Sequence, residues 1–284
     1  AGRRFRTNGM SGTSNVDAPP EMRGLSLFRY EVFEKMQQAQ IAAGSESPLS
    51  DLFAFGPIRE LTAKVGNQPE IIKGQAVSAG YYSGLGVQPS LGRTITNEDD
   101  RAGAAPVVVL SDQFWQARFG ANPDVIGQQL LLNKHSFTII GVNPPGFAGT
   151  LQVDYQPAVT IPLALERLVL GEKSNLGSAK EPGVWWLNLM GRLKPGATYD
   201  QARESLNSAF QSAALELMPS PTKADQLTAA QLDPKDYPRL LLESGSRGMP
   251  DVRKSYAPTI YGLLIVVALV LLIACANLAN LLLA

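Results

Sequence analysis

Few residues of this 284-residue chain have the types and spacing that catalysis or metal binding requires. His135 is the only histidine and Cys275 the only cysteine, so a two-histidine zinc motif, a thiolate cluster and an intrachain disulfide are all excluded. The densest acidic group, NEDD at residues 97–100, lacks the spacing and the glycine of an EF-hand loop. We therefore interpret residues 97–100 as a solvated loop and expect no metal site.

The patterns of nucleophilic and nucleotide-binding sites are also missing. No G-x-S-x-G occurs, and the S-x-x-K match at Ser220–Lys223 contains Pro221, which disfavours the helix that such a pair needs. His135 has no nucleophile near it in sequence, so we interpret it as a surface residue. The dipeptide Gly-Lys is absent, and Pro89 replaces the third glycine of a dinucleotide fingerprint that would start at Gly84. The sequence predicts no enzyme activity and no cofactor.

Composition indicates a folded chain without an electrostatic attraction to nucleic acid. Hydrophobic residues make up 45% of the chain, and 25 basic residues balance 25 acidic ones. The tryptophans Trp115, Trp185 and Trp186 are large enough to stack on a ligand, but we prefer core packing for them. Charged residues occur from Arg3 to Lys254 and then stop completely.

The uncharged end of the sequence, Ile260–Ala284, predicts a transmembrane helix. As an α-helix it is about 37 Å long, whereas the hydrocarbon core of a bilayer is about 30 Å thick. Its only strongly polar residues are Asn277 and Asn280, and Tyr261 lies where interfacial aromatic residues are found. A buried core helix is the alternative, but such helices are shorter and carry a polar stripe. We place the transmembrane helix at residues 257–284.

The elements before this helix alternate between helix and strand patterns. Residues 1–26 lack apolar periodicity and predict a linker or a poorly ordered arm. Apolar residues from Phe28 to Ala39 recur at helical spacing and predict a helix that ends at Gly44. The apolar runs that follow predict strands with breaks at Gly56-Pro57, Gly66-Asn67 and Gly74.

The middle of the chain predicts a strand, a helix and a hairpin. PVVVL at residues 106–110 suits a buried strand, and Ser111 is a suitable N-cap for a helix over Asp112–Phe119 that ends at Gly120. The next apolar run predicts a hairpin that turns at Asn133-Lys134, although this turn lacks a glycine.

The clearest helix before the membrane segment follows a strand that starts near Val184 and a turn at Pro195-Gly196. Thr198 and Gln201 have the spacing of a capping box. One apolar stripe follows at Ala202, Leu206, Phe210, Ala213 and Leu217, and Pro219 ends the helix. The loop-rich segment after it contains a possible strand at Leu240–Leu242.

Four stretches in this order resemble one known family. They are VSAGYYSGLGVQPSLGRTITNEDD, then APVVVLSDQFWQARFGANPDVIGQQLLLNKHSFTIIGVNPPGF, then LMGRLKPGATYDQAR and finally LVLLIACANLANLLLA. Together they resemble the extracytoplasmic core domain and second transmembrane helix of MacB/FtsX-like ABC transporter permeases. Among these they are most similar to the duplicated permeases without an ATPase of their own that are abundant in acidobacteria. The resemblance covers about residues 27–284.

The resemblance implies an α+β architecture. In it an extracytoplasmic core domain at residues 27–256 consists of two subdomains, called porter and Sabre. The porter subdomain is discontinuous, at residues 27–86 and 184–256, and the Sabre-like insertion occupies residues 87–183. A first transmembrane helix is expected before Ala1, and a Lys/Arg-rich segment after Ala284.

The resemblance also implies a function. Family members couple ATP hydrolysis by a separate cytoplasmic ATPase to movement of the periplasmic domain, a mechanotransmission that drives export or efflux. The implied partners are the lipid bilayer, the other permease helices and a second permease copy, and the implied location is the bacterial inner membrane with most of the chain periplasmic. Candidate helix-packing residues are Ala274, Ala276 and Ala279, with Asn277 and Asn280 as hydrogen-bonding residues.

Two other functions remain open at this point. A membrane-tethered extracytoplasmic binding or sensory module would show the same features of the sequence. A membrane-anchored hydrolase is disfavoured because no nucleophile and base can be named. Equally open is whether Asn277 and Asn280 hydrogen-bond to a neighbouring helix or merely cap or solvate the membrane exit.

Overall fold

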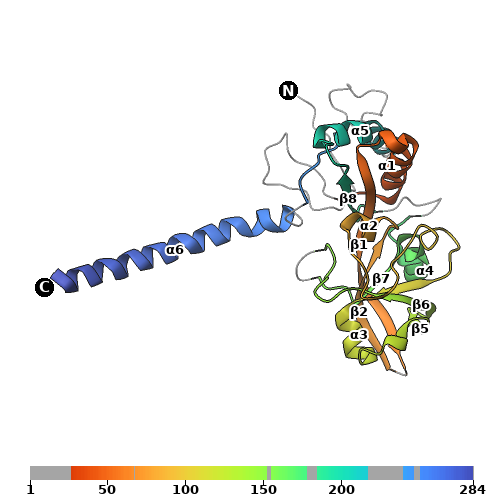
Figure 1. Cartoon of the computed structure of the whole chain (residues 1–284), viewed down its shortest axis with the longest axis horizontal. Helices are drawn as coiled ribbons and strands as arrows, with labels where there is room; N and C mark the ends of the chain where they lie inside the picture. The colour runs from red at the N-terminus through yellow and green to blue at the C-terminus, as the bar shows by residue number, and fades with distance from the viewer. Residues whose placement is uncertain are drawn as a thin grey trace, which may run out of the picture. The chain divides into compact units, whose positions relative to one another are not determined.

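The structure is a computed structural model. It describes the chain at residues 27–66, 68–151, 155–177, 184–216, 239–245 and 250–283. The chain divides into two compact units, Ala1–Leu242 and Glu243–Ala284. The first unit is a mixed α/β domain and the second consists mainly of one helix (Figure 1).

The first helix of the domain, α1 (Tyr30–Ala43), confirms the prediction from apolar spacing. Val32, Phe33 and Met36 are buried, and Gly44 ends the helix with a φ of 51°. Phe28 lies outside the helix in an antiparallel bridge with Leu187. The start of the periodic segment is therefore extended chain rather than helix.

The helix α5 (Tyr199–Glu216) packs against α1 and is also as predicted. Its capping box is formed: the Thr198 N–H donates to Gln201 Oε1 at 2.8 Å, and the Gln201 N–H donates to Thr198 Oγ1 at 3.2 Å. Leu217, the last residue of the expected stripe, lies outside the described residues. The buried side of α5 consists of Ala202, Leu206, Phe210 and Ala213.

A single long strand, β1 (Leu49–Val65), runs through the whole domain. Its first half pairs with β8 (Asn188–Leu193) and its second half with β2 (Gln68–Val77). The expected breaks at Gly56-Pro57 and Gly74 are therefore wrong, and only the expected turn near Gly66 separates two strands. Gly56 and Gly74 both lie inside strands because a neighbouring side chain occupies the space that a Cβ would need. At Gly74, a Cβ would meet Leu61 Cδ1 at 2.6 Å.

The second half of β1 belongs to a ring of paired strands, which we call the barrel. Around this ring β1 pairs with β2, β2 with β7, β7 with β4, β4 with β6, β6 with β5, and β5 again with β1. A two-residue strand, β3 (Leu91–Gly92), adds to β6. The other bounds are β4 (Val107–Leu110), β5 (Gln129–Leu132), β6 (His135–Val142) and β7 (Val159–Pro162).

The helix and hairpin predicted for the middle of the chain are confirmed within the barrel. The helix α3 (Asp112–Phe119) begins at Ser111, whose Oγ accepts the Phe114 N–H at 3.1 Å. The β5–β6 turn places Asn133 at a φ of 45° and Lys134 at 74°, so two non-glycine residues adopt the left-handed conformation that a type I′ turn needs. Short helices complete the domain: α2 (Tyr81–Leu85), α4 (Glu166–Leu170), η2 (Gly44–Glu46), η3 (Pro123–Val125), η4 (Leu163–Leu165) and η5 (Gly171–Lys173).

The remaining part of the domain we call the helical part. It comprises Phe28, α1, the first half of β1, β8 and α5, and it lies at the opposite end of β1 from the barrel strands β5 and β6 (Figure 1). Residues 239–242 join it without forming a strand, so the strand considered at Leu240–Leu242 is wrong. Leu240 is nevertheless buried, and its N–H donates to Asn207 Oδ1 at 3.3 Å.

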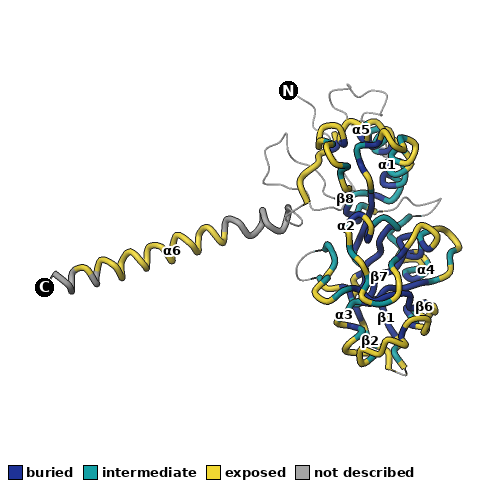
Figure 2. The backbone as a smooth tube through the Cα atoms, in the orientation of Figure 1, coloured by how far each residue is buried: buried dark blue, intermediate teal, exposed yellow. Residues whose placement is uncertain are grey.

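The second unit contains α6 (Pro250–Leu283), which starts before the apolar stretch. Within it Thr259–Ala276 has a mean hydropathy of 2.8, and none of this segment is buried. By length and composition it can cross a membrane. Figure 2 shows the contrast between this exposed helix and the buried strands of the domain.

Candidate functional site

The residues expected to pack against other membrane helices all lie in α6. Ala274, Ala276 and Ala279 are exposed, as is the free Cys275. Asn277 and Asn280 continue the same helix, and their side chains lie outside the described residues. Helical spacing puts Asn277 and Asn280, three residues apart, on one face, with Ala276 beside Asn280.

The residues singled out for chemistry are not brought together. His135 is exposed at the start of β6, as expected for a surface residue. The Ser220–Lys223 pattern lies outside the described residues. In the part of the chain that the structure describes, no group of three His, Cys, Asp or Glu residues is able to hold a metal ion.

The acidic loop at residues 97–100 differs from the solvated loop that we expected. Asp99 is only 7% exposed, and its carboxylate accepts hydrogen bonds from the two terminal guanidinium nitrogens of Arg93, at 2.6 and 2.9 Å. It also accepts the N–H and the hydroxyl of Thr96, both at 2.8 Å. Burial alone would raise the pKa of Asp99, but the bonds from Arg93 and Thr96 outweigh burial and lower it. The nearby Arg93 is the one feature of the sequence that could have suggested this ion pair.

The neighbouring Asp100 joins segments that are far apart in sequence. Its carboxylate accepts the N–H of Ala79, just after β2, at 3.0 Å, and the N–H of Ala164, in η4, at 2.8 Å. Burial raises the pKa of Asp100, and these N–H groups offset the rise only in part. Asp99 and Asp100 thus hold loops in place through these hydrogen bonds.

The next polar groups lie in an aromatic cluster formed by Phe53, Phe55, Tyr81, Tyr82 and Phe147. The Tyr82 hydroxyl donates to Asn143 Oδ1 at 3.0 Å, and the Tyr81 hydroxyl lies 3.1 Å from Thr150 Oγ1. Burial raises the pKa of Tyr81 and of Tyr82. Both phenols are structural groups because their hydroxyls are buried and satisfied.

Core packing is the role of at least one of the three tryptophans. Trp186 is 7% exposed and lies over Gly56 of β1. Trp115 is half-buried, and its Nε1–H donates to the Asn122 carbonyl at 2.9 Å. Trp185 packs partly buried against the core.

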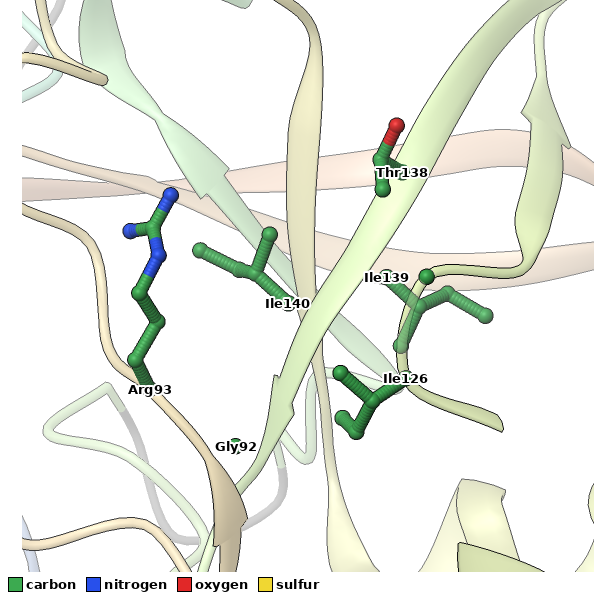
Figure 3. Close-up of a pocket in the computed structure, with 7 residues that line it drawn as sticks. Gly92, Arg93, Ile126, Thr138, Ile139 and Ile140 are labelled. Atoms are coloured by element: carbon green, nitrogen blue, oxygen red, sulfur yellow. The ribbon is translucent and has the colours of Figure 1, made fainter. Parts of the chain in front are cut away.

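A shallow groove of about 360 Å³ lies along β6 and β3 (Figure 3). Ile126, Ile139 and Ile140 make its lining mostly apolar. Arg93 lines one side, but Asp99 already binds its guanidinium group. The groove therefore offers an incoming anion no unpaired charge.

The fold and the apolar helix together define a folded α/β domain joined to a helix of membrane-spanning length. The family model of the MacB-like periplasmic core domain matches residues 7–209, well over half of the chain. The chain therefore belongs to the MacB-like periplasmic core domain family, whose members are found in ABC transporter permeases. No curated protein matches the chain.

Solved structures of bacterial permease domains are similar to this chain at low identity. The periplasmic region of MacB from Actinobacillus actinomycetemcomitans is 18% identical, with a TM-score of 0.46, covering 62% of this chain and 72% of that one. The extracellular domain of the noncanonical ABC-type transporter YknZ from Gram-positive bacteria is 15% identical, with a TM-score of 0.45, covering 71% and 87%. A domain of a putative permease from Porphyromonas gingivalis is 16% identical, with a TM-score of 0.45, covering 66% and 71%.

Proposed function

We propose that this chain is part of an ABC-type permease subunit that works in export or efflux by mechanotransmission. The observation that carries the proposal is the order of its two units: α6, which is long and apolar enough to cross a membrane, comes after a MacB-like periplasmic core domain in the chain. In this proposal α6 spans the bacterial inner membrane and the domain lies in the periplasm.

The proposed role needs an energy source outside the chain. A separate cytoplasmic ATPase would hydrolyse ATP, and the permease helices would pass the resulting movement to the periplasmic domain. The carboxylates of Asp99 and Asp100 are bound to Arg93 and to backbone N–H groups of the domain, which supports a mechanical rather than a catalytic role for them.

We also propose a subdomain division that follows the expected one except near β1. The helical part corresponds to the porter subdomain and the barrel to the Sabre-like insertion. The expected boundary at residue 86 would assign β2 to the porter, but β2 pairs with β7 of the insertion. A boundary inside β1, near Gly56, keeps all barrel strands together.

In the membrane we propose that α6 packs against other helices, including those of a second permease copy. Ala276 and Ala279 lie three residues apart and leave room for a close approach, while Asn277 and Asn280 supply interhelical hydrogen bonds. Ala274 lies roughly 160° around the helix from Ala276, so it would contact a different neighbour.

The test is to express the full-length gene in a bacterium and to wash its membranes with alkaline carbonate. We expect the protein to remain in the membrane pellet, the domain to be cleaved by protease added to spheroplasts, and an ATPase to co-purify. A protein that washes off, or a domain that is protected from the protease, would contradict the proposal. Co-purification of a signalling kinase instead of an ATPase would favour a sensory module.

A further inference from the structure

The helical part and the barrel share one strand rather than a linker. Phe55 of β1 takes part in both ladders, opposite Asn188 of β8 and opposite Val77 of β2. Residues before Phe55 pair with β8 and residues after it pair with β2. Any bending between the two parts must therefore occur in β1 close to Phe55.

The sequence of β1 just after Phe55 is poorly suited to a stiff strand. Gly56 has no side chain, and Pro57 has no backbone N–H to donate to a neighbouring strand. The register with β2 then shifts between Ile58 and Leu61. By itself, this stretch of β1 would be a natural point of bending.

One face of β1 at this point is covered by Trp186. Its indole ring lies so close to Gly56 that a Cβ there would meet Cζ3 at 2.3 Å. The backbone at Trp186 is held by the bridge of Phe28 with Leu187, and the backbone N–H of Trp186 donates to the Phe28 carbonyl at 3.1 Å. The ring thus blocks a bend of β1 toward this face.

The opposite face is covered by α2, because successive strand residues point to opposite sides. The ring of Phe53 lies against Gly84 of α2, where a Cβ would meet it at 2.3 Å. Tyr81 of α2 contacts the rings of Phe53 and Phe55 at centroid distances of 5.8 and 5.7 Å. α2 follows β2 in the chain and so belongs to the barrel side.

Polar bonds fasten α2 to both strands of the helical part. The Arg192 Nε–H of β8 donates to the Gly84 carbonyl at 2.6 Å, and the Ser83 hydroxyl donates to Asp51 Oδ1 of β1 at 3.0 Å. Both bonds join a neutral group to a charged one, the Arg192 guanidinium or the Asp51 carboxylate, so both are of the charge-assisted type.

We propose that Trp186 and α2 lock β1 from its two faces, so that the helical part and the barrel move as one rigid body. Loss of both contacts would turn Gly56-Pro57 into a hinge. The inference concerns the domain alone and holds whether or not the chain transports anything. If the proposed function also holds, the domain transmits the movement of the permease helices as one rigid body.

The test measures a distance between the two parts by pulsed electron paramagnetic resonance on the full chain in detergent micelles. Nitroxide labels go on Ser208→Cys in α5 and Ala117→Cys in α3, both exposed positions, in a Cys275→Ala background. We expect one narrow distance distribution. In the double variant Trp186→Ala/Arg192→Ala we expect the distribution to widen about twofold or more.

The control is Gln129→Ala/Ser136→Ala, which removes exposed polar bonds of the β5–β6 hairpin, away from both labelled helices, and should leave the width unchanged. A wild-type distribution as broad as that of Trp186→Ala/Arg192→Ala, or a double variant as narrow as wild type, overturns the proposal. If Trp186→Ala/Arg192→Ala fails to fold, the distance is measured instead in Ser83→Ala/Arg192→Ala. This second variant removes only the polar bonds between α2 and the helical part. A width equal to wild type in this second variant likewise overturns the role of α2.

Discussion

Gly56 and Trp186 are in a contact that no other residue type at position 56 would permit. A Cβ built on Gly56 lies 2.3 Å from Cζ3 and 2.4 Å from Cε3 of the indole, well inside van der Waals contact. Trp186 is 7% exposed and belongs to the main hydrophobic core, so its ring has little room to move away. The absence of a side chain at Gly56 is thus a packing requirement rather than a sign of a turn.

Gly56→Ala is expected to lower the free energy of unfolding by about 1–3 kcal/mol, because the added methyl group overpacks the Trp186 contact. Urea unfolding of the full chain in micelles, followed by tryptophan fluorescence, measures the change. Gly80→Ala is the matched control, since Gly80 has a φ of −74° and its nearest neighbour, Phe53 Cβ, is at an ordinary 3.5 Å. Equal stability losses in the two variants would contradict the packing argument.

Ser78 continues the β1–β2 ladder with its side chain. Its N–H donates to the Ala54 carbonyl at 2.8 Å, and its Oγ accepts the Ala54 N–H at 2.9 Å in a fully buried position. Ser78→Ala leaves the Ala54 N–H buried without an acceptor and is expected to cost about 1–3 kcal/mol of unfolding free energy. Ser208→Ala in α5 removes an exposed hydroxyl and should change this free energy by less than about 0.5 kcal/mol. A reversed order of these two losses would refute the assignment.

Asp99 and Asp100 are expected to affect stability in opposite directions as the pH changes. The pKa of Asp99 is lowered in the folded state, so its stabilising contribution is complete above the unfolded pKa of about 3.9 and is lost as the pH falls through the folded value. The pKa of Asp100 is raised, so its contribution becomes more favourable as the pH falls from above the folded pKa toward about 3.9.

Urea unfolding measured from about pH 3 to about pH 7 separates the two residues. The stability advantage of wild type over Asp99→Asn should shrink as the pH falls, and the advantage over Asp100→Asn should grow. Parallel pH profiles for the two variants would show that the adjacent carboxyl groups do not differ in this way.

The sequence predicts best those elements whose ends are set by residues close by in the chain. The cap of α3 at Ser111 and the capping box of α5 depend on neighbours three residues away, and the structure confirms both. The strand breaks predicted at Gly56 and Gly74 are wrong because each position needs glycine for a long-range contact. Trp186 occupies the space that a side chain at Gly56 would need, and Leu61 occupies that space at Gly74. No local pattern can show such a contact.

The same limit applies to the acidic loop. Asp99 binds Arg93, only six residues away, and a basic residue so close could have suggested an ion pair. The partners of Asp100 at Ala79 and Ala164 are backbone N–H groups, which every residue except proline has, so no residue type reveals them. Loop residues that act through backbone partners are therefore the hardest to recognise from sequence.

The association of α6 with other helices is expected to depend on its asparagines. Asn277→Leu/Asn280→Leu removes hydrogen-bonding groups worth about 0.6–2 kcal/mol each within a membrane, so association should weaken severalfold. Energy transfer between dyes attached to Cys275 measures the association of α6 helices in liposomes. Leu271→Ile, roughly 120–180° away around the helix, is the control and should have no effect. Unchanged association in the asparagine variant would mean that these residues do not bond to a neighbouring helix.

Membrane insertion of α6 depends on the absence of charge in its centre. Val267 lies in the middle of Thr259–Ala276, and its side chain is 56% exposed. Val267→Lys places an ammonium group at the bilayer centre, which costs about 3 kcal/mol on insertion scales, so more protein should be released by carbonate washing. Glu204→Lys, exposed on α5, changes charge in the domain and should leave the membrane fraction unchanged. Equal release of both variants would mean that α6 is not surrounded by lipid, since only a helix in hydrocarbon is sensitive to one central charge.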